Sequence, residues 1–266
     1  MTASSRRSRL TLRAIALGYL AVLLLVPVGV VFYRTFEHGL GAVYDAVTTP
    51  AAISAFWLTL EVAIIAVPLN AVFGVLAALA LVRGRFRGKR LFDALLDLPF
   101  AVSPIVVGLA LLLVWGVDGW FGGLGFQVIF SVPGIVLATI FVSLPFVARE
   151  VAPVLREIGD EQEQAAATLG ANGWQTFRRV TLPAIRWGLI YGVVLATARA
   201  IGEFGAVSVV SGKVAGETQT LTLLVQQRFE NFDLAGAYAA SALLALIALG
   251  TLVAMTILNK RREETT

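Results

Sequence analysis

The sequence predicts an all-α integral membrane protein, a single domain over residues 1–266 with six transmembrane helices. Of the 266 residues, 58% are hydrophobic and only 14% are charged, and the mean hydropathy is +0.84. This composition is too apolar for a soluble domain. Several apolar stretches also reach the roughly 20 residues that cross a bilayer as a helix. The Lys and Arg residues concentrate in alternate connections between these stretches, as a membrane topology requires.

Six apolar stretches are the predicted spans, and they lie at approximately 14–33, 55–82, 94–117, 128–148, 188–211 and 237–258. The first stretch follows four arginines, a combination that a signal peptide also shows. However, it is about 20 residues long, which exceeds a typical signal-peptide core, and no small-residue cleavage pattern follows it. We therefore expect this stretch to be the first transmembrane helix.

The basic residues predict which side of the membrane each connection faces. Three lie on one side, in the loops of Arg34, Lys213 and Arg228, and Arg199 lies within a span. The other seventeen of the 21 lie on the side of the two termini, and the positive-inside rule makes that side the cytoplasm. They are Arg6, Arg7, Arg9, Arg13, Arg83, Arg85, Arg87, Lys89, Arg90, Arg149, Arg156, Arg178, Arg179, Arg186, Lys260, Arg261 and Arg262.

The densest group of cations is the stretch RGRFRGKR at 83–90, between the second and third spans. Nucleic-acid binding is one interpretation of such a group. Because two spans flank it, a topology signal that also contacts anionic lipid is the favoured interpretation. The Gly-Lys pair within it is no phosphate-binding loop, since the GxxxxGK[ST] pattern is absent.

A polar segment, Asp160–Pro183, interrupts the apolar sequence and is called the hairpin below. Asp160 is suited to cap a helix with Glu163 in its first turn, and Gly170 is suited to the left-handed residue that ends it. Asn172, with Gln175 three positions later, repeats the capping pattern for a second helix that runs up to the proline. The pattern predicts two short helices joined by a glycine corner, either a docking element or simply a solvated connection.

The hairpin resembles the EAA signature of the membrane-spanning permeases of ABC importers. Ala165, Ala166, Gly170, Val180, Leu182 and Pro183 match the signature, whereas Gln164 stands where the family has Glu, directly after Glu163. The resemblance implies a type I ABC-importer permease fold in which the cytoplasmic loop 149–187 couples to an ATPase. The residues to which it gives this role are Glu163, Gln164, Ala165, Ala166, Gly170, Trp174, Phe177, Leu182 and Pro183.

Two spans carry candidate residues for a substrate pathway. Arg199 and Glu203 lie four positions apart on one helical face, so they form either an ion pair that only supports packing or part of an anion pathway. Gly202 and Gly205 allow close approach, and Ser103 and Pro104 mark a possible interruption of the third span. Gly188 and Gly192, spaced as GxxxG, are expected to serve helix packing.

Four stretches narrow the resemblance to sulfate/thiosulfate permeases of the CysW type, and more loosely to molybdate and tungstate permeases: 98–108, 144–150, 178–195 and 198–212. The resemblance implies a second homologous permease subunit, two copies of a cytoplasmic ATPase that binds ATP and Mg, and an extracytoplasmic sulfate- or thiosulfate-binding protein. It also implies the bacterial inner membrane. With no cysteine and no catalytic motif, the chain itself is expected to hold no cofactor and no metal and to be no enzyme. A gradient-driven anion transporter and a non-transporting scaffold are the alternatives.

Overall fold

Helices make up the regular structure of residues 6–263, the part of the chain that the computed structural model describes, and this part contains no strand. Residues 1–5 and 264–266, the two ends of the predicted domain, lie outside it. The helices are α1 (Arg6–Phe36), α2 (Gly39–Val47), α3 (Pro50–Val82), α4 (Lys89–Ala101), α5 (Pro104–Trp115), α6 (Val132–Glu157), α7 (Glu161–Thr168), α8 (Gly173–Thr176), α9 (Leu182–Ile201), α10 (Val207–Val210), α11 (Leu221–Glu230) and α12 (Leu234–Glu263).

Within residues 6–263, five continuous helical stretches are long and apolar enough to cross a membrane: Thr11–Phe36, Pro50–Val82, Val132–Glu157, Gly173–Ile201 and Leu234–Thr251. The pair α4 and α5, which is bent by 111° at a short break, makes a sixth if it counts as one span. The all-α class is therefore observed with five or six candidate spans, and the predicted third span is broken.

The centre of the bundle is formed by α3, α6 and α9, which pack closely because glycines face neighbouring backbones. A Cβ added at Gly192 of α9 would lie 2.9 Å from the Cα of Val147 in α6, and one at Gly188 would lie 2.9 Å from the carbonyl oxygen of Glu150. Gly74 of α3 approaches Val147 from the other side. The GxxxG spacing thus serves helix packing, as predicted.

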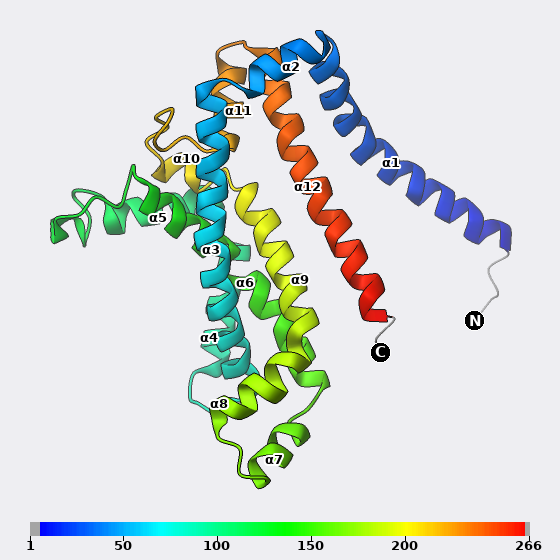
Figure 1. Ribbon diagram of the computed structural model, residues 1–266, viewed down its shortest axis with the longest axis vertical. Coiled ribbons are helices and arrows are strands. Elements are labelled where there is room, and N and C mark those ends of the chain that lie inside the picture. The colour runs from blue at the N-terminus through cyan, green and yellow to red at the C-terminus, as the bar shows by residue number, and fades with distance from the viewer. Residues whose placement is uncertain (1–5, 264–266) are drawn as a thin grey trace.

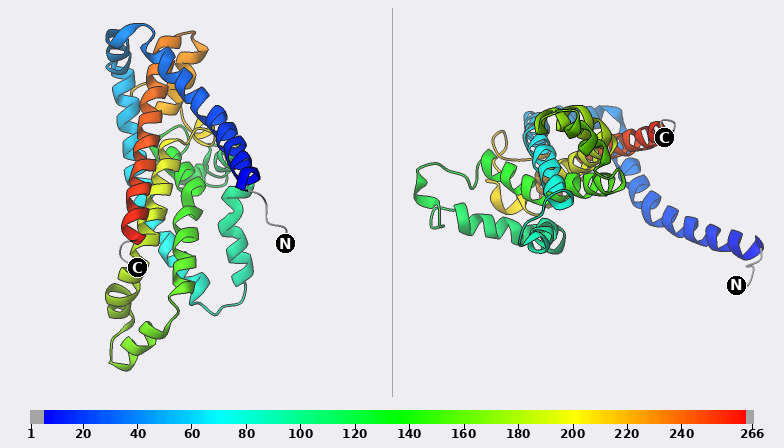
Figure 2. Two further views of the ribbon diagram at one scale, coloured as in Figure 1. Left: turned by 90° about the vertical axis from the view of Figure 1, so that its right-hand side faces the viewer. Right: turned by 90° about the horizontal axis from the view of Figure 1, so that it is seen from below.

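Two segments extend away from this bundle in opposite directions. Figure 1 shows α1 diverging on one side and α5 with the loop that follows it on the other, and the view from below in Figure 2 shows the same arrangement. In the apolar stretch of α1, Thr11–Phe36, Thr35 is buried and the other side chains are exposed or half-buried. The hairpin projects from one end of the bundle, which we call the hairpin end, and α2 and α11 close the far end (Figure 1).

The far end is more ordered than the sequence predicts. Residues 212–236 read as a solvated loop, but the structure contains α11 there, and Arg228 is 91% buried rather than exposed. Its guanidinium donates hydrogen bonds to the carbonyl oxygens of Ala46 (2.9 Å) and Gly236 (3.1 Å) and to the Thr49 hydroxyl (2.8 Å). These acceptors replace water around the charge, so the arginine ties the start of α3 to α11 and α12.

Candidate functional site

The glycine corner of the hairpin has the predicted geometry. Gly170 has φ +84°, its N–H donates to the carbonyl of Ala167, and the N–H of Ala171 donates to the carbonyl of Ala166, both at 3.0 Å. This pair of bonds ends α7 in the manner that favours glycine. After the corner, Asn172 and Gln175 exchange backbone and side-chain hydrogen bonds of 2.9 Å each, so the predicted capping box is present.

The second helix of the hairpin differs from the prediction because it does not end at Pro183. Instead α8 continues through a wider π-helical turn, Phe177–Thr181, directly into α9. A proline has no N–H to donate but fits the first turn of a helix, so Pro183 at the start of α9 leaves the helix unbroken. The second helix of the hairpin and α9 therefore form one continuous helix, Gly173–Ile201.

The predicted side-chain cap of Asp160 is wrong, because this residue precedes α7 but makes no capping hydrogen bond. Glu163 forms the local contacts instead. Its carboxylate lies 2.8 Å from the Nε of Arg83, at the end of α3, and accepts a 2.8 Å hydrogen bond from the hydroxyl of Thr181. Arg83 and Glu163 are 23% and 20% exposed, so the pair is mostly shielded from water.

Arg83 also donates hydrogen bonds to the carbonyl oxygens of Leu155 (3.1 Å) and Gly159, at the end of α6. One guanidinium thus joins the ends of α3 and α6 to the first turn of α7. Sequence reasoning counted Arg83 only as a topology signal. Nothing local could reveal its partner, because 80 positions separate it from Glu163.

The hairpin presents one exposed surface and one packed surface. Phe177 and Leu182 pack against the core cluster formed by α3, α6 and α9, so these two residues anchor the hairpin to its own bundle. Trp174 stacks on Phe177 with ring centroids 5.6 Å apart but remains 67% exposed, and Leu169 is 88% exposed. The side chains of Gln164, Ala165 and Pro183 are exposed as well, and Ala166 is half-buried.

Two broken helices meet within the bundle. The first break lies at Val102 and Ser103, between α4 and α5, and the second spans 202–206, between α9 and α10. A Cβ added at Gly205 would lie 2.9 Å from the Cβ of Pro104, so the two breaks are in contact. Ser103 is exposed, and its hydroxyl makes no capping hydrogen bond to α5. The helix over the predicted fifth span thus ends at Ile201, ten residues before Ser211.

Arg199 and Glu203 form an ion pair at the second break. The side chain of Glu203 is only 1% exposed, and its carboxylate also accepts a 2.8 Å hydrogen bond from the N–H of Ala206. The hydroxyl of Thr222 donates to its backbone carbonyl at 2.8 Å. The carboxylate and the backbone carbonyl of Glu203 thus both form contacts that hold the break. The side chain of Arg199 is 29% exposed.

Two acidic residues on α4 were not singled out from the sequence. Asp93 and Asp97 each have a carboxylate oxygen 2.7 Å from the guanidinium of Arg149 on α6. This cluster fastens the first half of the broken span to α6. The spacing of the two carboxylates by four positions was visible in the sequence, but their basic partner was not.

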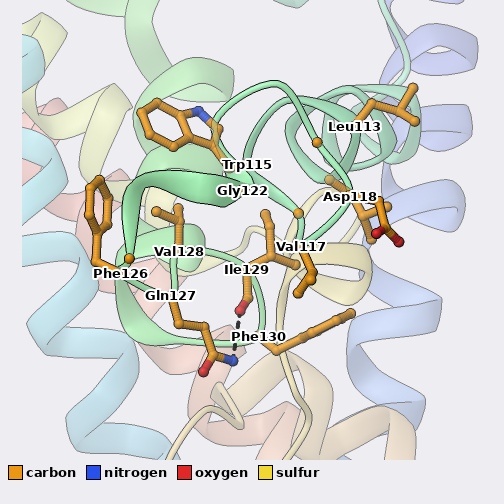
Figure 3. A pocket seen from close by; sticks show the side chains of 14 residues that line it. Leu113, Trp115, Val117, Asp118, Gly122, Phe126, Gln127, Val128, Ile129 and Phe130 are labelled. Carbon is orange, nitrogen blue, oxygen red and sulfur yellow. Dashed lines mark hydrogen bonds between the residues drawn. The ribbon is translucent and has the colours of Figure 1, made fainter.

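The loop after α5 encloses an apolar cavity of about 750 Å³. Figure 3 shows Trp115, Phe126 and Val128 around it, with Asp118 at its edge as the one charged lining residue. None of the candidate pathway residues lines this cavity, and its apolar lining does not suit an anion. In residues 6–263, no three His, Asp or Glu side chains group together in a way that would hold a metal ion.

Residues 70–264 match the family described as "Binding-protein-dependent transport system inner membrane component". The chain is 53% identical over 252 residues to the sulfate transport system permease protein CysW of Synechocystis sp., covering 93% of this chain and 91% of that protein. It is 50% identical over 247 residues to CysW of Escherichia coli K12, covering 91% and 85%.

Solved structures show the same fold at low identity. A bacterial ABC transporter involved in the import of the acidic polysaccharide alginate matches with a TM-score of 0.76 and 16% identity, covering 98% of this chain and 97% of that chain. The same kind of transporter in complex with an alginate pentasaccharide-bound periplasmic protein matches with a TM-score of 0.74 and 15% identity, covering 96% of both chains.

Proposed function

This chain belongs to the inner-membrane permease components of binding-protein-dependent ABC importers, and within them to the CysW type; on this premise we propose that it forms part of the membrane pathway of an ATP-driven importer of sulfate or thiosulfate. The observation that carries the proposal is identity of about half over more than nine-tenths of the chain to proteins named as sulfate transport permeases. The chain itself catalyses no reaction, because ATP and Mg bind to a partner.

The proposed assembly contains a homologous second permease subunit, two copies of a cytoplasmic ATPase and an extracytoplasmic binding protein that delivers the anion. The excess of cations supports a cytoplasmic location for both termini and for the hairpin end. The hairpin must lie there, because ATP is hydrolysed inside the cell. A solved relative of the fold is described in complex with a periplasmic protein, which supports the last of these partners.

We propose that the ATPase docks on the exposed surface of the hairpin, around Gln164, Ala165, Leu169, Gly170 and Trp174. ATP binding closes the two ATPases and supplies the difference in affinity between the inward-open and outward-open states that such a switch requires. The displacement then reaches the spans by two routes. One is the continuous helix from α8 into α9, and the other is the contact of Glu163 with Arg83 at the end of α3.

The proposed anion pathway passes the two broken helices, where Ser103, Pro104, Gly202 and Gly205 lie at or beside the breaks and Arg199 offers positive charge. Irregular backbone at membrane depth is tolerated where it lines a cavity, and discontinuous helices are a common way to build a substrate site. Glu203 positions the arginine and the N–H of Ala206 rather than meeting the anion itself.

Uptake of radiolabelled sulfate by cells that lack this chain tests the proposal, with the chain restored in one arm, ATP depleted in a second and excess molybdate added in a third. We expect uptake to be lost, to return with the chain, to require ATP and to be unaffected by molybdate. Restored uptake that molybdate abolishes would move the substrate to molybdate. Uptake that persists under ATP depletion would contradict the ABC mechanism itself.

A further inference from the structure

A basic cavity of about 540 Å³ lies at the hairpin end, and neither the hairpin nor the breaks at 102–103 and 202–206 contribute to its lining. Its lining comes from the end of α3, the loop before α4, the first turn of α4 and the last turn of α6: Leu81, Phe86, Gly88, Lys89, Arg90, Asp93 and Arg156. Figure 1 shows the loop between α3 and α4 at the same end as α7 and α8. Three cations from two helices thus surround one cavity.

Within residues 6–263, none of these three cations forms an ion pair with a carboxylate. Two nearby cations, by contrast, do have close carboxylates. Arg83 is paired with Glu163, and Arg149 is paired with Asp93 and Asp97. Lys89 only donates a 3.2 Å hydrogen bond to the carbonyl of Gly84. Asp93, the single acid of the cavity, already lies 2.7 Å from Arg149. The cavity therefore keeps an excess of positive charge.

The position of Lys89 and Arg90 is locally unfavourable for the helix. They occupy the first turn of α4, which contains no acidic residue, where the positive end of the helix dipole repels cations. Cations at an unfavourable position, with no carboxylate of the described chain to offset them, indicate a stabilising partner outside the chain. An anion in the cavity would offset both the dipole and the three side chains.

Apolar side chains lie beside the cavity. Phe86, which lines it, is 44% exposed and packs edge-to-face on Phe92, with centroids 6.1 Å apart. Leu91, Leu95 and Leu98 are 64%, 53% and 41% exposed, but at about 100° per residue they lie on the face of α4 opposite Lys89 and Asp93. A free inorganic anion would make no use of Leu81 and Phe86 in the cavity, whereas the start of an acyl chain would contact them.

We propose that this cavity binds the headgroup of an anionic phospholipid, with its phosphate between Lys89, Arg90 and Arg156 and the start of an acyl chain against Phe86. Charge complementarity selects the headgroup, because cations near a membrane surface favour anionic lipid by about 1 kcal/mol each. The inference requires that the hairpin end lies at the membrane surface, and it is independent of which anion is transported.

The test counts the lipids retained by the purified transporter complex. The complex is exchanged into a non-ionic detergent containing small amounts of either phosphatidylglycerol or phosphatidylcholine, and retained lipid is counted by native mass spectrometry. We expect retention of phosphatidylglycerol but not phosphatidylcholine, with affinity falling about five-fold for each cavity cation that is removed. The test variant is Lys89→Gln/Arg90→Gln, with Arg156→Gln as a second variant on the other helix.

The matched control is Arg85→Gln/Arg87→Gln, which removes the same charge from the same loop at two exposed residues outside the cavity. It should retain the lipid. Lys89→Gln/Arg90→Gln removes two cations that the helix dipole repels, so this variant should unfold at the wild-type temperature or above. Lost binding therefore cannot be ascribed to unfolding. Equal loss in test and control variants, or competition by inorganic phosphate at equal concentration, would overturn the proposal.

Discussion

The guanidinium of Arg83 lies 2.8 Å from the carboxylate of Glu163, so the end of one transmembrane helix is held to the first turn of the hairpin. Thr181, at the junction of the hairpin with α9, donates to the other oxygen of the same carboxylate at 2.8 Å. The contact therefore spans three segments that must move together if the hairpin drives the spans. Glu163 lies one position before Gln164, where the EAA signature has its glutamate.

Removing the Arg83–Glu163 contact should weaken coupling more than it weakens folding. We expect Glu163→Gln and Arg83→Gln each to cost about 1–3 kcal/mol of stability, since each leaves a partly shielded charge without its partner. Uptake per ATP hydrolysed should fall markedly in both. The measurement is the ratio of sulfate transport to ATP hydrolysis by the complete transporter in proteoliposomes.

The exchanged pair Arg83→Glu/Glu163→Arg is the informative companion. It should recover less than the wild-type ratio, because an arginine at 163 cannot accept the Thr181 hydrogen bond and a glutamate at 83 cannot donate to the carbonyls of Leu155 and Gly159. A wild-type ratio in either single variant would refute the role in coupling.

Gly170→Asp should leave folding nearly intact and uncouple ATP hydrolysis from transport. A Cβ at this position meets no atom within 4 Å, so the cost of the change is the left-handed backbone, about 1 kcal/mol, which aspartate and asparagine both tolerate comparatively well. The aspartate adds a negative charge to the proposed docking surface. Normal uptake by Gly170→Asp would remove the hairpin from the mechanism.

Gly170→Asn is the matched control, because it has nearly the same shape and backbone preference without the charge. It should retain most of the coupling ratio. If the asparagine variant were as uncoupled as the aspartate variant, added bulk or backbone strain would be responsible rather than charge.

Two local features of the hairpin were predictable from the sequence, although the equally local side-chain cap expected of Asp160 is absent. The corner at Gly170 and the capping box of Asn172 and Gln175 are closed by residues within five positions, so local propensity determines them. The partner of Glu163 was not predictable, because tertiary packing alone brings Arg83 to it. The same holds for Arg149 with its two aspartates and for the burial of Arg228.

The broken helices show a second limit of sequence reasoning. Hydrophobicity predicted continuous spans at 94–117 and 188–211, yet the helices stop at Ala101 and at Ile201. An apolar stretch reports that a segment lies in the membrane but not whether its backbone stays helical, because protein neighbours can satisfy the groups that a break exposes. Ser103 and Pro104 signalled the possibility for the third span, whereas Gly205 was expected only to allow close approach, and the contact of Gly205 with Pro104 required the structure.

Gly192→Ala should destabilise the bundle by about 1–3 kcal/mol, because overpacking in a close-packed interior forces its neighbours apart. The added methyl group would lie 2.9 Å from the Cα of Val147, a backbone atom that cannot rotate away. Gly250→Ala in α12 is the control, since a Cβ there meets nothing within 4 Å. Thermal unfolding in detergent should show a lowered midpoint for the first variant alone. An unchanged midpoint for Gly192→Ala would mean that α6 and α9 pack less closely than described.

Removing one member of the Arg199–Glu203 pair at a time distinguishes a pathway residue from a packing residue. Arg199→Gln leaves a carboxylate that is 1% exposed without its cation, so this variant should lose up to about 3 kcal/mol of stability. Glu203→Gln should lose less, because its partner is 29% exposed and water can solvate it. In the double variant Arg199→Gln/Glu203→Gln neither charge is stranded, and stability should return close to the wild-type value.

Uptake should not return with stability in the double variant if Arg199 meets the anion. We expect sulfate uptake to be lost in Arg199→Gln and in the double variant, and to be retained in part in Glu203→Gln, where the positive charge persists. Thermal unfolding and uptake measured on the same four proteins separate the two quantities. If uptake instead followed stability and recovered in the double variant, the pair would only hold the second break together, and Arg199 would have no part in recognising the anion.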